Sequence, residues 1–161
     1  MGIQTSGCSA DADPPRQESF DLEPGLSLLG DEHVARYRET DGEVGYLWNG
    51  ATCLLLTTTG RSSGEPRTVP LIFAADGERC IVVASMGGAP RHPNWYLNLS
   101  ADPGVEVQVR GDRFEAAART LDEAERERCW ALAVAVWPSY EEYAARTERV
   151  IPVVALERSG G

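Results

Sequence analysis

The chain has 161 residues, of which 42% are apolar, and this is enough for one domain with its own core. Its formal net charge is −10, and every one of its 15 basic residues is arginine. An acidic chain is a poor partner for nucleic acid or an anionic membrane, and no apolar run approaches the length of an integral membrane segment.

The first residues differ in composition from the rest of the chain. Residues 1–24 are polar and contain Pro14-Pro15, so we expect a mobile N-terminal tail. The segment lacks the apolar stretch of a secretory signal peptide. Residues 25–161 are expected to form a single domain.

Hydrophobic periodicity and turn signals predict the elements in chain order. A short helix is followed by three strands, a helix that begins with proline, two strands, two helices and a closing strand. A capping box at Thr120–Glu123 is expected to start the longer of the last two helices. The ranges are Asp31–Thr40, Ala51–Thr59, Arg67–Ala75, Arg79–Ser85, Pro93–Ala101, Val105–Val109, Arg113–Thr120, from the capping box to about Trp137, a short helix containing Tyr140 and Tyr143, and Ile151–Leu156. About six strands with two or three helices favour a small barrel of the α+β class, mainly β with peripheral helices.

The cysteines and histidines carry no metal-ligand spacing. We therefore expect free thiols in a reducing cytoplasm, and no metal site. The residues considered are Cys8, Cys53, Cys80, Cys129, His33 and His92.

A glycine-containing turn, Gly60–Gly64, follows the first long apolar run, and Arg61 and Arg67 flank it. Glycine allows close backbone approach to a ligand, successive turn amides bind anions, and arginine binds phosphate or carboxylate through two hydrogen bonds. Because Pro66 and a strand follow, the turn is neither a Rossmann loop nor a nucleotide P-loop. A hairpin connection with a solvated arginine is the alternative.

A second turn, Gly87-Gly88, follows the strand end at Val83–Met86. The amides of this strand end and the Ser85 hydroxyl are candidates to contact the edge of a flavin-like ring. The helix beginning at Asn94-Trp95-Tyr96, with Asn98 one turn later, offers free amides and a positive dipole to an anion. A plain strand end, and core packing of the two aromatic residues, are the alternatives.

Tyr140 and Tyr143 are three residues apart and therefore share a helix face. Aromatic packing accounts for this spacing as well as a substrate-facing role does. A tyrosine hydroxyl facing a substrate orients its oxygen and supplies a proton.

Five blocks in order resemble the deazaflavin-dependent nitroreductase family, and the similarity runs from about Tyr37 through Glu157. The blocks are TTTGR at Thr57–Arg61, G-x-P-R-x-x-P-L at Gly64–Leu71, AS-x-GGA at Ala84–Ala89, NWYLNL at Asn94–Leu99 and PSYEEY at Pro138–Tyr143. The resemblance implies a six-stranded, FMN-binding-like split β-barrel that binds coenzyme F-420, a deazaflavin with a phosphate and an oligoglutamate tail.

The resemblance also implies roles for individual residues. Tyr140 and Tyr143 would line the substrate pocket as catalytic residues, and Tyr140 would also touch the cofactor. The implied cofactor-binding residues are Arg61, Ser62, Ser63, Arg67, Thr68, Val69, Pro70, Leu71, Ile72, Val83, Ala84, Ser85, Met86, Gly87, Asn94, Trp95, Tyr96, Asn98 and Tyr140. The chain departs from the family pattern at Ser62 and Met86, which replace lysines, and at Ile72, which replaces a tyrosine.

The expected function is hydride transfer from the reduced deazaflavin to a small electron-poor acceptor: a quinone, an enone or other activated C=C, or a nitroaromatic. The cofactor carries this chemistry, so no catalytic triad or metal set is required. Two alternatives remain: a split-barrel reductase that uses FMN or FAD, with FMN less favoured than F-420, and a non-enzymatic carrier of cofactor or hydrophobic ligand. We expect a cytoplasmic protein, peripheral to the membrane where the acceptor is a lipophilic quinone. The sequence does not fix the oligomeric state, and the resemblance is compatible with a homodimer.

Overall fold

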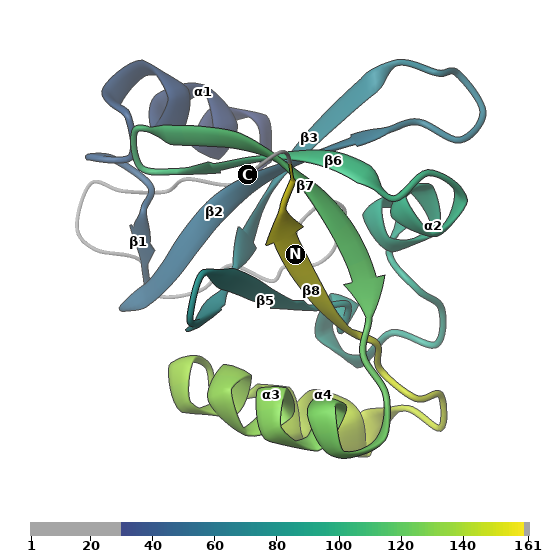
Figure 1. Ribbon diagram of the computed structural model, residues 1–161. Coiled ribbons are helices and arrows are strands. Elements are labelled where there is room, and N and C mark those ends of the chain that lie inside the picture. The colour runs from purple at the N-terminus through teal and green to yellow at the C-terminus, as the bar shows by residue number, and fades with distance from the viewer. Residues whose placement is uncertain (1–29, 160–161) are drawn as a thin grey trace.

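The computed structural model describes residues 30–159 (Figure 1). The tail expected at residues 1–24, and residues 25–29, 160 and 161 of the expected domain, lie outside the described part. Within it, eight antiparallel strands and four α-helices give a mixed α+β fold. No helix in this part is long and apolar enough to cross a membrane.

Seven strands form one antiparallel sheet in the order β1-β2-β6-β7-β8-β5-β4, and β3 pairs with the other edge of β2. The strands are β1 Leu47–Trp48, β2 Ala51–Thr59, β3 Pro66–Ile72, β4 Ala74–Asp76, β5 Arg79–Val83, β6 Gly104–Val109, β7 Asp112–Thr120 and β8 Val153–Arg158. The predicted strands recur within two residues of these bounds, except that the run predicted as Arg67–Ala75 divides into β3 and β4.

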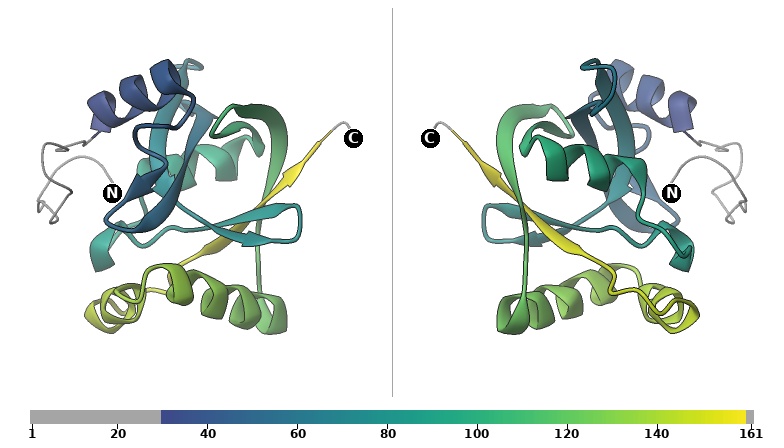
Figure 2. Two further views of the ribbon diagram at one scale, coloured as in Figure 1. Left: turned by 90° about the vertical axis from the view of Figure 1, so that its left-hand side faces the viewer. Right: turned by 90° about the vertical axis from the view of Figure 1, so that its right-hand side faces the viewer.

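This division lies at Phe73 and curls the sheet. The Phe73 amide donates to the Thr52 carbonyl oxygen (3.0 Å), and the Thr52 hydroxyl donates to the Phe73 carbonyl (2.9 Å). Up to this point the chain pairs with β2, and directly after it β4 pairs with β5. The sheet therefore curls back on itself (Figure 2). The predicted count of six strands differs from the eight observed because of this break and because of the two-residue β1.

The helices lie on different sides of the curled sheet (Figures 1 and 2). They are α1 Gly30–Thr40, α2 Asn94–Ala101, α3 Glu123–Val136 and α4 Tyr140–Arg146, and a 3-10 turn η1 spans Met86–Gly88. α1 lies on the side opposite α3 and α4. α2 packs Trp95 and Leu99 into the interior of the sheet, where alternate residues of the strands form the main apolar core.

The capping box predicted at Thr120–Glu123 is wrong. The N-cap of α3 is Asp122, and no side chain caps the helix. Thr120 is the last residue of β7, opposite Val154 of β8, and its hydroxyl lies 3.0 Å from the Tyr96 hydroxyl. The strand pairing therefore holds Thr120 outside the helix.

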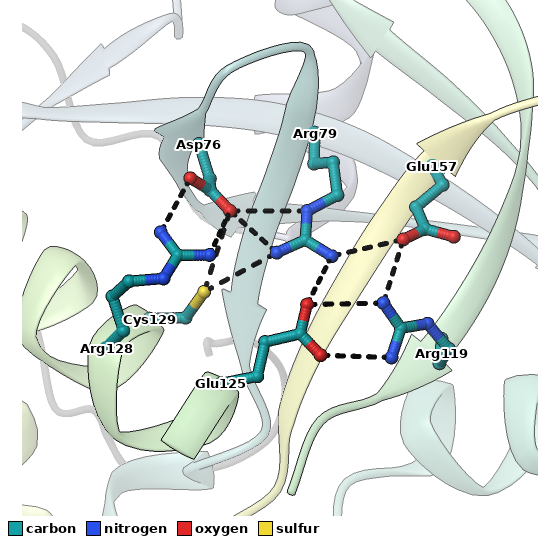
Figure 3. Close-up of polar contacts among 7 residues, drawn as sticks. All are labelled: Asp76, Arg79, Arg119, Glu125, Arg128, Cys129 and Glu157. Carbon is teal, nitrogen blue, oxygen red and sulfur yellow. Dashed lines mark hydrogen bonds and ion pairs between the residues drawn. The ribbon is translucent and has the colours of Figure 1, made fainter.

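An ion-pair network connects α3 to four strands (Figure 3). Arg79 of β5 contacts Asp76 of β4 (2.6 Å), Glu125 of α3 (2.9 Å) and Glu157 of β8 (3.1 Å). Arg119 of β7 contacts the same two glutamates at 3.2 and 3.0 Å. Because the Asp76 and Arg79 side chains are only 18% and 19% exposed, salt screens this pair less than a surface pair.

The network surrounds the buried thiol of Cys129. Its Sγ lies 3.8 Å from Asp76 Oδ2 and from Arg79 Nη2. Burial raises the pKa of this thiol, so it is held as the neutral thiol. Cys53 and Cys80 are also buried, and both are free thiols, as predicted, whereas Cys8 lies outside the described residues.

Candidate functional site

A cleft of about 760 Å³ lies between α1, the β2–β3 loop, β3 and α2. This volume falls in the range of roughly 300–1,000 Å³ that small-molecule sites occupy. The cleft brings together nine of the residues predicted to bind a cofactor, which are Arg61, Ser62, Ser63, Arg67, Thr68, Val69, Asn94, Trp95 and Asn98.

Arg61 is held by the first turns of α2. Its backbone N–H and its Nη1 both donate to Asn98 Oδ1, at 3.2 and 2.8 Å, and its Nη2 donates to Asn94 Oδ1 at 3.4 Å. The Asn98 side chain is buried and donates in turn to Thr58 Oγ1 at 3.2 Å. The two asparagines lie one helical turn apart, so they share the face of α2 that meets the loop.

The loop that carries Arg61 is a closed turn. The Gly60 amide donates to the Glu65 carbonyl, and the Gly64 amide donates to the Gly60 carbonyl, both at 2.8 Å. Ser63 Oγ accepts from the Glu65 amide (3.1 Å) and from Arg67 Nη2 (3.5 Å). A Cβ on Gly60 would lie 2.7 Å from Ser63 Oγ and 3.2 Å from the Glu65 carbonyl oxygen, so a larger residue here would displace the Ser63 hydroxyl from its contacts with Glu65 and Arg67.

A third arginine, Arg38 of α1, also lines the cleft, although it was not among the predicted cofactor-binding residues. Its Nη2 donates to Thr68 Oγ1 at 2.9 Å, and Thr68 Oγ1 lies 2.7 Å from Thr57 Oγ1. The sequence around Arg38 contains no signal for this role, because the role depends on α1 packing beside β3.

The cleft carries a local excess of positive charge. Within residues 30–159, neither Arg38, Arg61 nor Arg67 forms an ion pair with a carboxylate, whereas Arg79 and Arg119 are fully engaged with glutamates and aspartate. The lining contains three arginines and a single acidic residue, Asp31. Guanidinium groups without acidic partners suit an anionic ligand.

β3 continues from this cleft toward a second group of predicted residues. Val69 and Leu71 face the main core, and Leu71 is buried there. Ile72 faces the opposite side and packs in an apolar cluster formed with α3 and α4. Pro70 lies between them and is partly buried.

The turn after β5 packs against α4. A Cβ on Gly88 would lie 2.7 Å from the Tyr143 carbonyl oxygen, so the backbones of the turn and the helix are in direct contact. Ser85 is buried, and the Met86 side chain is 37% exposed. Ala84 is fully buried in the core, its amide donates to the Pro152 carbonyl oxygen (2.9 Å) and its carbonyl oxygen accepts from Arg149 (3.2 Å), so its amide is not available to a ligand.

Tyr140 and Tyr143 lie beside this turn in one aromatic group. Tyr140 is buried with Val83 and Ile151, and its ring centroid is 6.0 Å from that of Tyr143. Tyr143 Oη accepts from Trp137 Nε1 at 3.3 Å, whereas the Tyr140 hydroxyl has no hydrogen bond to another residue in the range 30–159. Burial raises the pKa of both hydroxyls, so both keep their proton near neutral pH.

The structure thus separates the predicted residues into a basic cleft and an aromatic region, connected by β3 and by the segment from Ala84 to α2. Trp95 packs in the core while lining the cleft, and Tyr96 packs against the core from its partly exposed position. No group of three or more residues suited to hold a metal ion occurs in the described part of the chain.

A curled antiparallel sheet with a basic cleft at one side and an aromatic region at the other offers one site for an anionic group and another for a planar ring. A family model described as F420H(2)-dependent quinone reductase matches residues 30–158. The chain belongs to this family.

Similar proteins agree with this assignment. A Mycobacterium tuberculosis protein named as an F420H(2)-dependent quinone reductase is 42% identical over 138 residues, which cover 83% of this chain and 92% of the relative. A solved structure described as an F420-H2 dependent reductase is 44% identical, covers 65% of this chain and 93% of its own, and has a TM-score of 0.62. Another, described as a domain-swapped dimer, is 41% identical, covers 78% of this chain and 95% of its own, and has a TM-score of 0.65.

Proposed function

We propose that the chain transfers hydride from reduced coenzyme F-420 to a quinone, and that the cofactor's anionic tail lies in the cleft of Arg38, Arg61 and Arg67. One observation carries the proposal: three arginines without carboxylate partners in the described part line one cleft of a strongly acidic chain. A phosphate and an oligoglutamate tail supply the negative charge that these groups lack. FMN offers a single phosphate and would leave part of this charge unpaired.

The aromatic region is assigned to the ring and the acceptor. In this proposal the Ser85–Gly87 turn and Ile72 lie beside the deazaflavin ring, and Tyr140 and Tyr143 lie beside the quinone. When bound, the cofactor supplies a hydride in a two-electron step. The chain's own part is to hold the tail, exclude water from the apolar region and donate a hydrogen bond to the acceptor oxygen.

Finer features of the fold belong to the same proposal. With β3 and β4 counted as one interrupted strand, β2, β5, β6, β7 and β8 complete a six-stranded split β-barrel of the FMN-binding-like kind. A homodimer is also proposed, and its support is the relative described as a domain-swapped dimer. A cytoplasmic location, with the membrane as the source of a lipophilic quinone, completes the proposal.

The test is a titration of the purified chain with coenzyme F-420 and, separately, with FMN, followed by fluorescence. Reduced F-420 is then mixed with the protein and a soluble quinone, and its reoxidation is followed by absorbance. Saturable binding of F-420 and quinone-dependent reoxidation support the proposal. Tight FMN binding without F-420 binding would favour the FMN reductase, and F-420 binding without turnover on quinones, enones or nitroaromatics would favour a carrier.

A further inference from the structure

Arg149 is a half-buried arginine whose guanidinium faces the segment between β5 and α2. It lies in the loop after α4, and within residues 30–159 it forms no ion pair with a carboxylate. Its guanidinium instead donates hydrogen bonds to four acceptors in residues 84–92. Nε donates to the Ala89 carbonyl oxygen (2.8 Å) and Nη2 to the Ser85 carbonyl oxygen (2.8 Å). Nη1 donates to both the Ala84 carbonyl oxygen (3.2 Å) and His92 Nδ1 (3.0 Å).

The contact with His92 also defines the state of its ring. Burial and the neighbouring Arg149 charge lower the pKa of His92, so the ring is neutral near pH 7. An arginine has no acceptor, so the neutral ring accepts at Nδ1 and carries its proton on Nε2. The four contacts to Arg149 are therefore compatible with one another.

Residues 84–92 need support from outside the segment. Met86, Gly87 and Gly88 have φ values of 48°, 64° and 84°, so three successive residues are left-handed, and one of them is not glycine. This conformation is unfavourable for a residue with a side chain. The segment's own backbone bonds are two, from the Gly88 amide to the Ser85 carbonyl and from the Ala89 amide to the Met86 carbonyl.

The geometry has a consequence for ligand binding. Arg149 draws the carbonyl oxygens of Ala84, Ser85 and Ala89 toward itself. Ser85 is right-handed and Met86 left-handed, the sequence of conformations that turns successive amides to one side. The amides of Ser85, Met86 and Gly87 make no hydrogen bond within the described part of the chain, so they remain available to a ligand.

From these contacts we infer that Arg149 is a positioning residue for the cofactor site: it holds residues 84–92 in the conformation that presents the amides of the Ser85–Gly87 turn and that leads into Asn94 of α2. It acts through the segment and not by touching the ligand. The identity of the ligand, F-420, rests on the proposed function. The contacts of Arg149 in the free protein do not depend on it.

The experiment compares Arg149→Met and Arg149→Lys with Arg146→Met. The control removes a more exposed arginine from the neighbouring helix, whose Nη1 makes a single 3.3 Å contact with the Gly87 carbonyl. Amide hydrogen exchange over residues 84–92 of the free protein, the thermal midpoint, and F-420 affinity by fluorescence are measured for each variant. Lysine keeps the charge and part of the hydrogen bonding, so it tests rescue.

We expect Arg149→Met to speed exchange at residues 84–92 with β2 and β6 unchanged, and to weaken F-420 binding at least tenfold. Arg149→Lys should give intermediate values, and Arg146→Met should stay within about twofold of wild type. Unchanged exchange or unchanged affinity in Arg149→Met overturns the inference, as does an equal effect of Arg146→Met. If Arg149→Met does not fold, the test rests on Arg149→Lys. Wild-type hydrogen exchange and F-420 affinity in Arg149→Lys overturn the inference, whereas faster exchange confined to residues 84–92 supports it.

Failure of the proposed function gives a different result. In that case wild-type protein fails to bind F-420, while hydrogen exchange in the free variants still reports whether Arg149 holds the segment. If only the inference fails, wild-type protein still binds F-420, and the Arg149 variants have the same F-420 affinity and hydrogen exchange as wild type.

Discussion

Arg61 and Asn98 are joined by two hydrogen bonds that share one acceptor, because the Arg61 amide and its guanidinium both donate to Asn98 Oδ1. The buried amide of Asn98 therefore sets the direction of the β2–β3 loop and of the arginine side chain together. An arginine that is oriented in advance loses less conformational entropy when an anion binds.

Arg61→Ala and Arg67→Ala are each expected to weaken F-420 binding by about tenfold to a hundredfold, since a charged hydrogen bond contributes about 1.5–3 kcal/mol. Fluorescence titration measures the change. Arg36→Ala is the matched control, because it removes the same charge from an exposed position whose nearest carboxylate contact is 3.9 Å. Equal affinities for all three variants and wild type would exclude the cleft as the tail site.

Arg38→Ala should also weaken F-420 binding, by about threefold to thirtyfold. Both arginines are exposed, but the Arg38 guanidinium makes one hydrogen bond, to Thr68, whereas that of Arg61 is oriented by two, to Asn94 and Asn98, so the expected loss is smaller than for Arg61. Isothermal titration at two salt concentrations measures it, and the difference from wild type should shrink at high salt. A loss equal to that of Arg36→Ala, on the same helix, would show that only long-range charge is involved.

The order of strands and helices could be predicted from the sequence because each element carries local signals: alternation in β6, an apolar run in β2, and proline before α2. The division at Phe73 could not be predicted, since the residue belongs to a continuous apolar run and its conformation is set by pairing with Thr52. The cap of α3 was predicted wrongly for the same reason, because strand pairing outweighs a local side-chain motif.

The candidate site divides in the same way. Arg61 and Arg67 could be identified from their position around a glycine turn. Arg38 and Arg149 could not, because their partners lie 30 and at least 57 residues away in the chain. Only the packing of α1 on β3, and of the loop after α4 on residues 84–92, brings them to the site.

Ser62→Lys is expected to tighten F-420 binding by a few-fold. Ser62 is exposed and lines the basic cleft, so a lysine there adds a cation without displacing a buried group. The gain should fall as ionic strength rises, since exposed charges are screened. Affinity measured across a salt series checks this, with Ser100→Lys on the exposed side of α2 as the control. A gain that does not depend on salt would contradict an electrostatic role.

The network around Arg79 predicts how stability depends on pH. Hydrogen bonds from arginines lower the pKa values of Asp76, Glu125 and Glu157 in the folded chain. A carboxyl group whose pKa is lowered by folding stabilises the folded state at any pH above its unfolded-state pKa, which is 3.8 for aspartate and 4.5 for glutamate. This stabilisation is lost as the pH falls from the unfolded-state pKa through the folded-state pKa. Thermal midpoints should therefore fall steeply below about pH 4.5.

Two further variants separate this effect from others. Asp76→Asn should lower the midpoint at pH 7 and flatten its decline below about pH 4. His33, whose pKa burial lowers, should cause a separate and earlier decline as pH drops below 6.5, because the unfolded chain then binds the proton first. An Asp76→Asn variant with the wild-type pH profile would show that the network does not contribute.

Tyr140 and Tyr143 differ in one respect that predicts different roles. The Tyr143 hydroxyl is engaged with Trp137, whereas that of Tyr140 has no partner among residues 30–159 and is free to donate to an incoming acceptor oxygen. Since burial raises the pKa of Tyr140, this hydroxyl acts as a hydrogen-bond donor rather than as a readily ionised acid.

Tyr140→Phe should lower kcat/KM for a quinone by up to about a hundredfold, with F-420 affinity changed by less than about threefold. Folding should be little affected, because the lost hydroxyl has no partner within the described residues. Tyr143→Phe should have a smaller effect on kcat/KM and a larger one on the thermal midpoint, since it leaves Trp137 Nε1 without this acceptor. Steady-state kinetics with a quinone and a nitroaromatic acceptor measure both variants.

The loss of kcat/KM in Tyr140→Phe should differ between the two acceptors, because their oxygens lie at different distances from the atom that takes the hydride. Wild-type kinetics in both variants would assign these tyrosines to packing alone.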